Sequence, residues 1–234
     1  MNFDNKTVLI TGAAGNLGRA VARAFADDGA RLALVGRHID SLRQAFGDEN
    51  AQRLYLAADL MQPEQVSAAV GTVVERSGRI DVLCNLAGGF RMGDAVHDTS
   101  DATWDFLFDL NARTVLHMAH AVVPHMIERG GGKIVNVSAY AALKGTARTG
   151  AYAASKSAVI RLTETMAAEL REQSINVNCV LPTTLDTPEN RAAMPDADPA
   201  RWVAPRDLAS VVAFLASDAA CAIHGAALPV TGLG

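Results

Sequence analysis

Short apolar runs alternate with longer amphipathic stretches along the chain, and this alternation constrains the fold more than any other feature. The runs are almost continuously apolar, as strands buried on both faces are. They lie at 8–10, 32–35, 54–56, 82–84, 134–137 and 175–177, and "AALPVTG" at 226–232 adds a last strand. Alanine-rich stretches long enough for helices lie at about 17–28, 64–76, 102–128 and 151–172. This order predicts an α/β fold, a doubly wound parallel sheet of about seven strands with helices on both faces.

No shift in composition divides the 234 residues, so we expect a single domain, 1–234. Half of the residues are hydrophobic, yet no apolar stretch approaches the ~18 residues needed to span a bilayer. The first residues lack a basic region followed by a long apolar one, so we expect a soluble, unprocessed protein of the cytoplasm. The net charge is −4 without a long run of Lys or Arg, which excludes the basic footprint of a nucleic-acid binder.

The cysteines are few and widely spaced. Cys84, Cys179 and Cys221 form none of the close pairs that metal binding or redox chemistry requires. We therefore expect no metal site, and we expect all three to be small buried hydrophobic residues in a reducing compartment.

The segment "TGAAGNLG" at 11–18 follows the first apolar run and opens a helix. In an open parallel sheet, this turn presents backbone N–H groups and the positive end of a helix to a phosphate. Gly12 would allow a sharp bend and Gly18 a close approach of helix and strand. Gly15 and Asn16 compete for the middle position, because Asn tolerates positive φ and caps helices well. Taken alone, the segment is either a phosphate-binding turn or only a tight bend.

The pattern Tyr-x-x-x-Lys occurs twice, as "YAALK" at 140–144 and "YAASK" at 152–156. Side chains four residues apart meet only on a helix. Tyr152 begins an alanine-rich helical stretch, whereas Tyr140 follows a strand and precedes Gly145. We therefore predict that Tyr152 is the catalytic acid. Tyr140 either lines the substrate pocket or is a partly buried loop aromatic.

Over essentially its whole length the chain resembles the short-chain dehydrogenase/reductase family. The glycine turn at 11–18 and "NLAG" at 85–88 support this resemblance, and further matching positions are Asp59, Asn111, Ser138, Tyr152 and Lys156. It implies a Rossmann-type fold and a turn that cradles a dinucleotide pyrophosphate. It also implies a site for nicotinamide cofactor formed by Gly12, Gly15, Asn16, Leu17, Gly18, Arg37, Asp59, Leu60, Asn85, Ala87, Gly88, Tyr152, Lys156, Pro182, Leu185 and Thr187.

The resemblance implies a catalytic tetrad of Asn111, Ser138, Tyr152 and Lys156. Reduction of a carbonyl or imine by hydride requires a proton donor for the heteroatom. A free tyrosine has a pKa of ~10, so we expect Lys156 and the charge of oxidised nicotinamide to favour the phenolate. By resemblance, Ser138 positions the substrate oxygen, and Asn111 holds a water that returns the proton through Lys156.

The end of the second strand bears on the choice of cofactor. NAD binders place an acid there for the ribose 2′-hydroxyl, and NADP binders use an Arg for the 2′-phosphate. Here Gly36 stands at the acid's position and Arg37 follows. NADP(H) is therefore favoured over NAD(H). Asp40, which we expect to be the N-cap of the next helix, is the residue that could instead reach a ribose hydroxyl.

The segment at 181–202 resembles the corresponding part of dihydropteridine reductases, as does "AGG" at 87–89. Those enzymes typically favour NADH and lack the serine, whereas this chain has Arg37 and Ser138. A general NADPH-dependent carbonyl reductase, including the 3-oxoacyl type, is thus at least as well supported as a pterin reductase. A non-catalytic NADP(H) sensor is the alternative from another class, and the presence of Tyr152 and Lys156 argues against it.

Two expectations concern larger parts of the molecule. Residues 188–202 contain three prolines, with Met194 and Trp202 as apolar surface, and follow Thr187, which the resemblance places against the nicotinamide carboxamide. We expect them to form a mobile lid over the nicotinamide pocket, with an ordinary surface loop as the alternative.

The stretches at 102–128 and 151–172 match helices that pair in family members, which predicts a homodimer or homotetramer.

Overall fold

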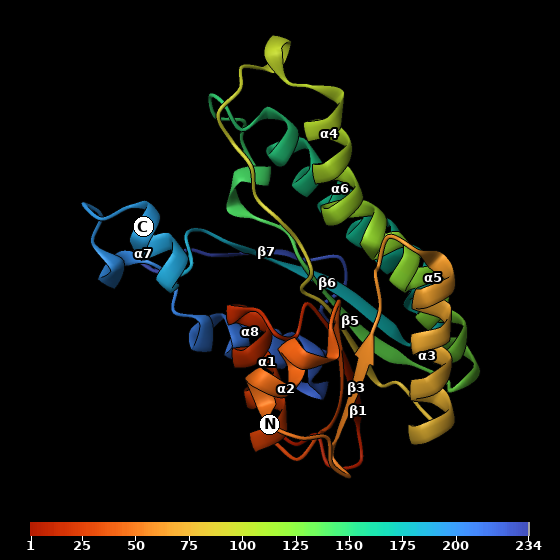
Figure 1. Ribbon diagram of the computed structural model, residues 1–234. Helices are drawn as coiled ribbons and strands as arrows, with labels where there is room; N and C mark the ends of the chain where they lie inside the picture. Colours follow the sequence, from red (N-terminus) through yellow and green to blue (C-terminus); the bar gives the residue numbers. More distant parts are fainter. Residues whose placement is uncertain (234) are drawn as a thin grey trace.

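Seven parallel strands form one sheet in residues 1–233, the part of the chain that the computed structural model describes (Figure 1). They are β1 (Thr7–Thr11), β2 (Arg31–Gly36), β3 (Arg53–Ala57), β4 (Val82–Asn85), β5 (Gly132–Val137), β6 (Ile175–Pro182) and β7 (Ala227–Val230). Their order in the sheet is β3-β2-β1-β4-β5-β6-β7. The order reverses between β1 and β4, and ligands of open parallel sheets bind beyond the carboxyl ends of the strands at such a point.

Helices cover both faces of the sheet (Figure 1). Within residues 1–233 they are α1 (Asn16–Asp27), α2 (Ile39–Phe46), α3 (Pro63–Ser77), α4 (Asp101–Phe108), α5 (Thr114–Glu128), α6 (Gly150–Leu170), α7 (Pro188–Ala193) and α8 (Pro205–Ala216). Buried side chains of α1, α2 and α8 form one core cluster, and those of α3, α5 and α6 form the other. None of these helices has the length and apolarity needed to cross a lipid bilayer.

Alternation along the strands explains why their sequences are almost continuously apolar. Val8 and Ile10 of β1 point into the core beneath α1 and α8, whereas Leu9 points into the core beneath α3 and α5. All three side chains are fully buried. A strand covered on both faces has no solvent side on which polar residues would be favoured. The predicted doubly wound α/β fold is therefore confirmed.

The helix expected over 102–128 is divided by a wider turn. α4 ends at Phe108, residues Asp109–Arg113 form a π-helical segment, and α5 begins at Thr114. The wider turn contains Asn111, which is buried. π-helical turns inside α-helices are frequent at functional sites because they displace one side chain from the α-helical path.

Two local expectations, for Asp40 and Cys221, are wrong, and the structure decides the alternative left open at Asn16. Asp40 is not an N-cap, because α2 begins at Ile39, which packs against the core, and His38 is the capping residue. Asn16 is not an N-cap either: Gly15 holds that position at φ −70°, and Asn16 is the first residue of α1. Cys221 is exposed, while Cys84 and Cys179 are buried as expected. Cys221 follows the short helical turn at 218–220, beyond the core that encloses the other two.

Candidate active site

The glycine turn between β1 and α1 packs closely against neighbouring backbone because two of its residues lack side chains. Gly12 has φ +64°, and a Cβ there would lie 3.0 Å from the backbone of Ala87 in the loop after β4. A Cβ on Gly18 would lie 2.4 Å from the carbonyl oxygen of Gly12. The first turn of α1 has neither a side-chain cap nor an acidic residue. Its free N–H groups therefore suit an anion such as the pyrophosphate of a dinucleotide.

A cleft of about 810 Å³ extends from this turn along the carboxyl edge of the sheet. Of the residues predicted to bind cofactor, its walls include Gly12, Gly15, Asn16, Leu17, Gly18, Arg37, Asp59, Leu60, Ala87, Gly88, Leu185 and Thr187. Asn85, Tyr152, Lys156 and Pro182 lie outside this lining, Asn85 and Pro182 at buried strand ends and the other two on α6. Asn85 donates from Nδ2 to Oδ1 of Asn136 at 2.9 Å. The lining runs from the glycine turn past Arg37 and Asp59 to Gly88 and Thr187.

Some residues of the cleft have no counterpart in the sequence predictions. His38 and Ser41 extend the wall beside Arg37, and Phe106, Leu110 and Thr114 extend it near the π-helical turn. His38 and Ser41 could have been predicted, because both lie within four residues of Arg37 in the sequence. The other three depend on the wider turn, which the sequence does not reveal.

Asn111 is held by the loop after β4 and by α6. Its Oδ1 accepts a hydrogen bond from the backbone N of Gly89 at 2.9 Å. Its Nδ2 donates to the carbonyl of Gly89 at 3.1 Å and to Oγ of Ser155 at 3.0 Å. The π-helical turn thus positions a buried amide between two elements of the site.

Ser138, Tyr152 and Lys156 come together where β5 ends beside α6. Tyr152 and Lys156 lie one turn apart on α6, whereas Tyr140 belongs to a short 3₁₀ turn at 140–142. Ser138 donates from Oγ to the carbonyl of Lys156 at 2.7 Å. Lys156 donates from Nζ to the carbonyl of Val137 at 3.0 Å. These two bonds fix the end of β5 against the helix.

Gly88 connects this group to the cleft. It lines the cleft, and a Cβ on it would lie 3.0 Å from Oδ1 of Asn111 and 3.1 Å from Nζ of Lys156. The amide and the ammonium group therefore flank one glycine of the cleft wall.

Burial sets the protonation of the two titratable groups. It raises the pKa of Tyr152 to about 12 and lowers the pKa of Lys156 to about 8. In the protein alone, the pKa of Tyr152 is thus raised and not lowered as the sequence suggested, because the loss of water outweighs other effects. Tyr152 is protonated at neutral pH, as a proton donor must be.

A family model described as short chain dehydrogenase matches residues 6–198. The chain belongs to the short-chain dehydrogenase/reductase family. It is 36% identical over 243 residues to D-threitol dehydrogenase of Mycolicibacterium smegmatis, covering 98% of this chain and 93% of the relative. It is 34% identical over 244 residues to 3-oxoacyl-[acyl-carrier-protein] reductase FabG of Thermotoga maritima, covering 99% and 98%.

Solved structures of this family superpose closely on the chain. L-sorbose reductase of Gluconobacter frateurii, complexed with NADPH and L-sorbose, matches with a TM-score of 0.89 at 29% identity, covering 99% of this chain and 97% of that one. NAD⁺-bound xylitol dehydrogenase matches with a TM-score of 0.90 at 29% identity, covering 99% and 100%. This short-chain dehydrogenase/reductase is thus a nicotinamide-dependent oxidoreductase. Of these two structures, one holds NADPH and the other NAD⁺.

Proposed function

We propose that this enzyme reduces a small-molecule carbonyl compound with NADPH and that Tyr152 donates the proton. The junction at Gly88 supports the proposal most directly, because Asn111 and Lys156 meet the dinucleotide cleft at that glycine. A nicotinamide cofactor bound in the cleft supplies the hydride. A binding protein that only sensed NADP(H) would have no use for a buried Tyr and Lys beside the cleft.

Each residue of the tetrad has a part in moving or holding the proton. Tyr152 donates from its hydroxyl to the substrate oxygen, on which negative charge develops. Ser138 rotates its hydroxyl away from the Lys156 carbonyl and donates to the same oxygen. Lys156, held by the Val137 carbonyl, returns a proton to Tyr152. Asn111 holds the water that supplies Lys156.

A substrate panel tests this function. Ketones, 3-oxoacyl thioesters and quinonoid dihydropterins are each mixed with NADPH and enzyme, and the absorbance of NADPH is followed. We expect oxidation of NADPH with at least one carbonyl class. The 34% identity to a 3-oxoacyl reductase makes thioesters the second candidate. Binding of NADPH without turnover of any compound would instead favour the sensor.

The pH dependence of reduction follows from the pKa of Lys156. Because burial lowers that pKa to about 8, the ammonium group loses its proton as the pH rises through this value. Reduction consumes a proton that Lys156 must return to Tyr152, so kcat is expected to fall above about pH 8. Steady-state rates between pH 6 and about 10 measure this. A kcat for reduction that rises through this range would contradict the relay.

Arg37 is predicted to set the preference for NADPH. It lies on the cleft wall, and within residues 1–233 its guanidinium has no hydrogen-bond or ion-pair partner that a 2′-phosphate would have to displace. Such charge-assisted contacts contribute about 1.5–3 kcal/mol, so Arg37→Ala should weaken NADPH binding by about one to two decades. The Kd of NADH should stay unchanged, and fluorescence titration measures both. Equal affinities of the unmutated enzyme for the two cofactors would contradict the prediction.

We also propose that the enzyme is a homodimer or homotetramer. α4 and α5 leave Trp104, Leu116 and Ile127 exposed, and large apolar side chains in that position suit contact with a second copy. Light scattering at micromolar concentration should give a multiple of 24.6 kDa. A monomer mass would count against this assembly.

A further inference from the structure

Two loops bring large apolar side chains to the mouth of the site. In the loop at 89–98 after β4, Phe90 and Met92 are 57% and 60% exposed. In the loop at 139–149 after β5, Tyr140 and Leu143 are 46% and 52% exposed. Both loops follow the carboxyl ends of strands, and Gly88, just before the first loop, lines the cleft.

Hydrogen bonds join the two loops into one wall. Gly93 donates from its backbone N to the carbonyl of Arg148 at 3.0 Å, and Arg148 donates from Nη1 to the carbonyl of Gly93 at 2.7 Å. The guanidinium of Arg91 lies 3.7 Å from the centre of the Phe106 ring. Both arginines thus already have partners within the protein. The loops also contain Asp94, His97, Asp98 and Lys144.

Phe90 connects this wall to the reacting group. Its ring meets the ring of Tyr152 edge to face, with centroids 4.7 Å apart at 89°. A substrate that accepts the proton of Tyr152 therefore places the carbon atoms beside its carbonyl near Phe90. Apolar carbon gains from this contact, whereas a hydroxyl placed there loses water without gaining a partner.

We infer that the substrate is an apolar ketone, with a hydrocarbon or aromatic group beside the carbonyl, and not a polyhydroxylated sugar. This inference rests on the proposed function and narrows it. D-threitol dehydrogenase and L-sorbose reductase are named for hydroxylated compounds. The large side chains of this wall offer such hydroxyls few hydrogen-bond partners, and an unpaired hydroxyl in an apolar pocket lowers specificity for a substrate by up to about 100-fold.

Matched ketones test the inference. Benzylacetone and erythrulose are both reduced at a carbonyl, but only erythrulose has hydroxyl groups beside it. We expect kcat/KM with NADPH to be at least about tenfold higher for benzylacetone. Phe90→Ser should remove most of this advantage by lowering kcat/KM for benzylacetone more than for erythrulose, whereas the apolar control Phe90→Leu should retain it. Preference for erythrulose, or an equal loss on both ketones in Phe90→Ser, would overturn the inference.

A binding measurement separates this inference from the proposed function. The melting temperature of the NADP⁺ complex is recorded with and without benzylacetone, for the unmutated enzyme and for Phe90→Ser. Suppose that neither ketone oxidises NADPH, but benzylacetone raises the melting temperature of the unmutated complex and not that of Phe90→Ser. The inference then stands and the proposed activity fails. If benzylacetone leaves that temperature unchanged, the inference fails.

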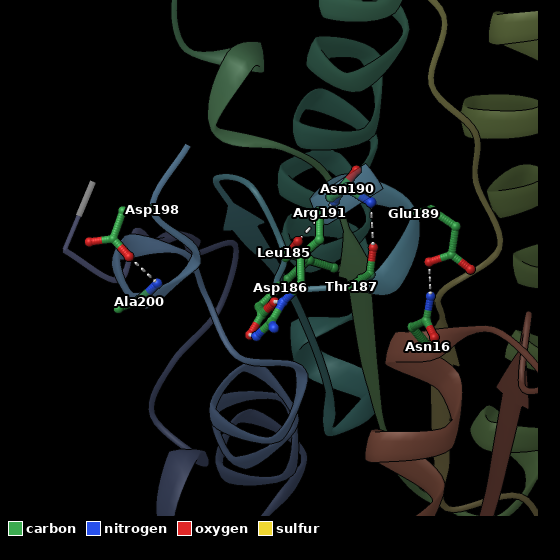
Figure 2. A network of polar contacts seen from close by, with 9 residues as sticks. All are labelled: Asn16, Leu185, Asp186, Thr187, Glu189, Asn190, Arg191, Asp198 and Ala200. Carbon is green, nitrogen blue, oxygen red and sulfur yellow. Dashed lines mark hydrogen bonds and ion pairs between the residues drawn. The ribbon is translucent and has the colours of Figure 1, made fainter. Parts of the chain in front are cut away.

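A separate observation concerns a hydrogen bond across the cleft. Asn16, at the start of α1, donates from Nδ2 to Oε2 of Glu189 in α7 at 2.7 Å (Figure 2). Arg19 in turn donates from Nη2 to Oδ1 of Asn16 at 2.9 Å. The glycine turn lines one side of the cleft, and Leu185 and Thr187, just before α7, line the other. The bond therefore connects the two walls.

Local contacts hold α7 in the orientation that allows this bond (Figure 2). Thr187 caps the helix by accepting at Oγ1 from the backbone N of Asn190 at 3.2 Å. Asn190 donates from Nδ2 to the carbonyl of Leu185 at 2.8 Å. The N–H of Glu189 itself, then Thr187 and Asn16, lower the pKa of the Glu189 carboxyl, so it is ionised at neutral pH.

We propose that residues 188–202 form a lid and that the Asn16–Glu189 hydrogen bond holds this lid closed over the pyrophosphate. Asn16 stands where the family resemblance expects a glycine, and a glycine would have no side chain to reach Glu189. The bond adds a barrier to release of the cofactor, because the two walls must separate before a dinucleotide can leave. Asn16 and Glu189 are thus residues that retain the cofactor.

Cofactor release measures the effect of this bond directly. Bound NADPH is displaced by excess NADP⁺ in a stopped-flow fluorimeter, which gives koff without turnover. Glu189→Ala and Asn16→Gly should each raise koff by about threefold to tenfold. The double variant should be no faster than the faster single variant, because both changes remove one bond. Glu189→Gln, which retains an acceptor oxygen, should restore most of the slow release.

A control variant and hydrogen exchange complete the test. Glu75→Ala, on the exposed face of α3, should leave koff unchanged. NADP⁺ should protect residues 188–202 from exchange in the unmutated enzyme and protect them less in Glu189→Ala. The proposal would be overturned if the increases in koff of the two single variants multiplied in the double variant. It would also be overturned if NADP⁺ left hydrogen exchange of residues 188–202 unchanged.

Discussion

Tyr152→Phe is expected to lower kcat by about 10²–10⁴-fold, the usual contribution of a positioned acid. The substitution removes the hydroxyl and leaves the ring that meets Phe90 edge to face. Packing and the dinucleotide cleft should therefore persist, so the Kd of NADPH should stay within about twofold. Stopped-flow rates of NADPH oxidation and fluorescence titration of NADPH measure the two quantities.

Tyr140→Phe is the matched control. Both tyrosines precede a lysine by four residues, but only Tyr152 shares an α-helix with its lysine. Tyr140→Phe should retain most of the activity, with any change confined to KM for the substrate. The assignment of the acid would be wrong if Tyr140→Phe were inactive while Tyr152→Phe remained active.

Gly18→Ala is expected to cost about 1–3 kcal/mol in free energy of unfolding, the range for added volume at a packed site. Its Cβ would lie 2.4 Å from the carbonyl oxygen of Gly12 and 2.5 Å from that of Ala13. Backbone atoms cannot rotate away as a side chain can, so the turn must open. The N–H groups at the start of α1 would then be displaced, and NADPH binding should be lost with the stability. Urea unfolding and cofactor titration measure the two losses.

Gly15→Ala provides the comparison within the same turn. Its Cβ would lie 3.3 Å from the Gly12 carbonyl oxygen, and the residue has φ −70°, which alanine adopts without strain. We expect a much smaller change in both unfolding and binding. If Gly18→Ala bound NADPH as well as Gly15→Ala does, the close approach of helix and strand would not determine the shape of the site.

The fold was predictable because its main determinant is local. Each strand needs apolar residues on both faces, as Val8, Leu9 and Ile10 illustrate, and this requirement is visible in any short window of sequence. Helix starts at Pro63 and Pro205 are likewise local, since proline suits the first turn. The start of α2 was missed because the packing of Ile39 on the core, and not the capping preference of Asp40, determines where the helix begins.

The site was predictable only in part. Tyr152 and Lys156 were assigned from motif spacing and Asn111 and Ser138 from family resemblance, but neither source predicts the contacts of these residues. The partner of Asn16 lies 173 residues away in α7, beyond the reach of any local pattern. The raised pKa of Tyr152 depends on how much water the folded protein excludes, which a spacing of four residues does not describe.

The π-helical segment at 109–113 makes the site sensitive to the length of the chain as well as to its composition. An α-helix advances about 100° per residue, so removing a single residue between α4 and α5 would allow the α-helical path to close and would rotate Asn111 relative to Gly89 and Ser155. A conservative replacement of any one of the five side chains in that segment would leave this rotation unchanged, because the number of residues stays the same. A deletion in this segment would rotate α5 about the helix axis relative to α4. Substitution scans do not sample such a change.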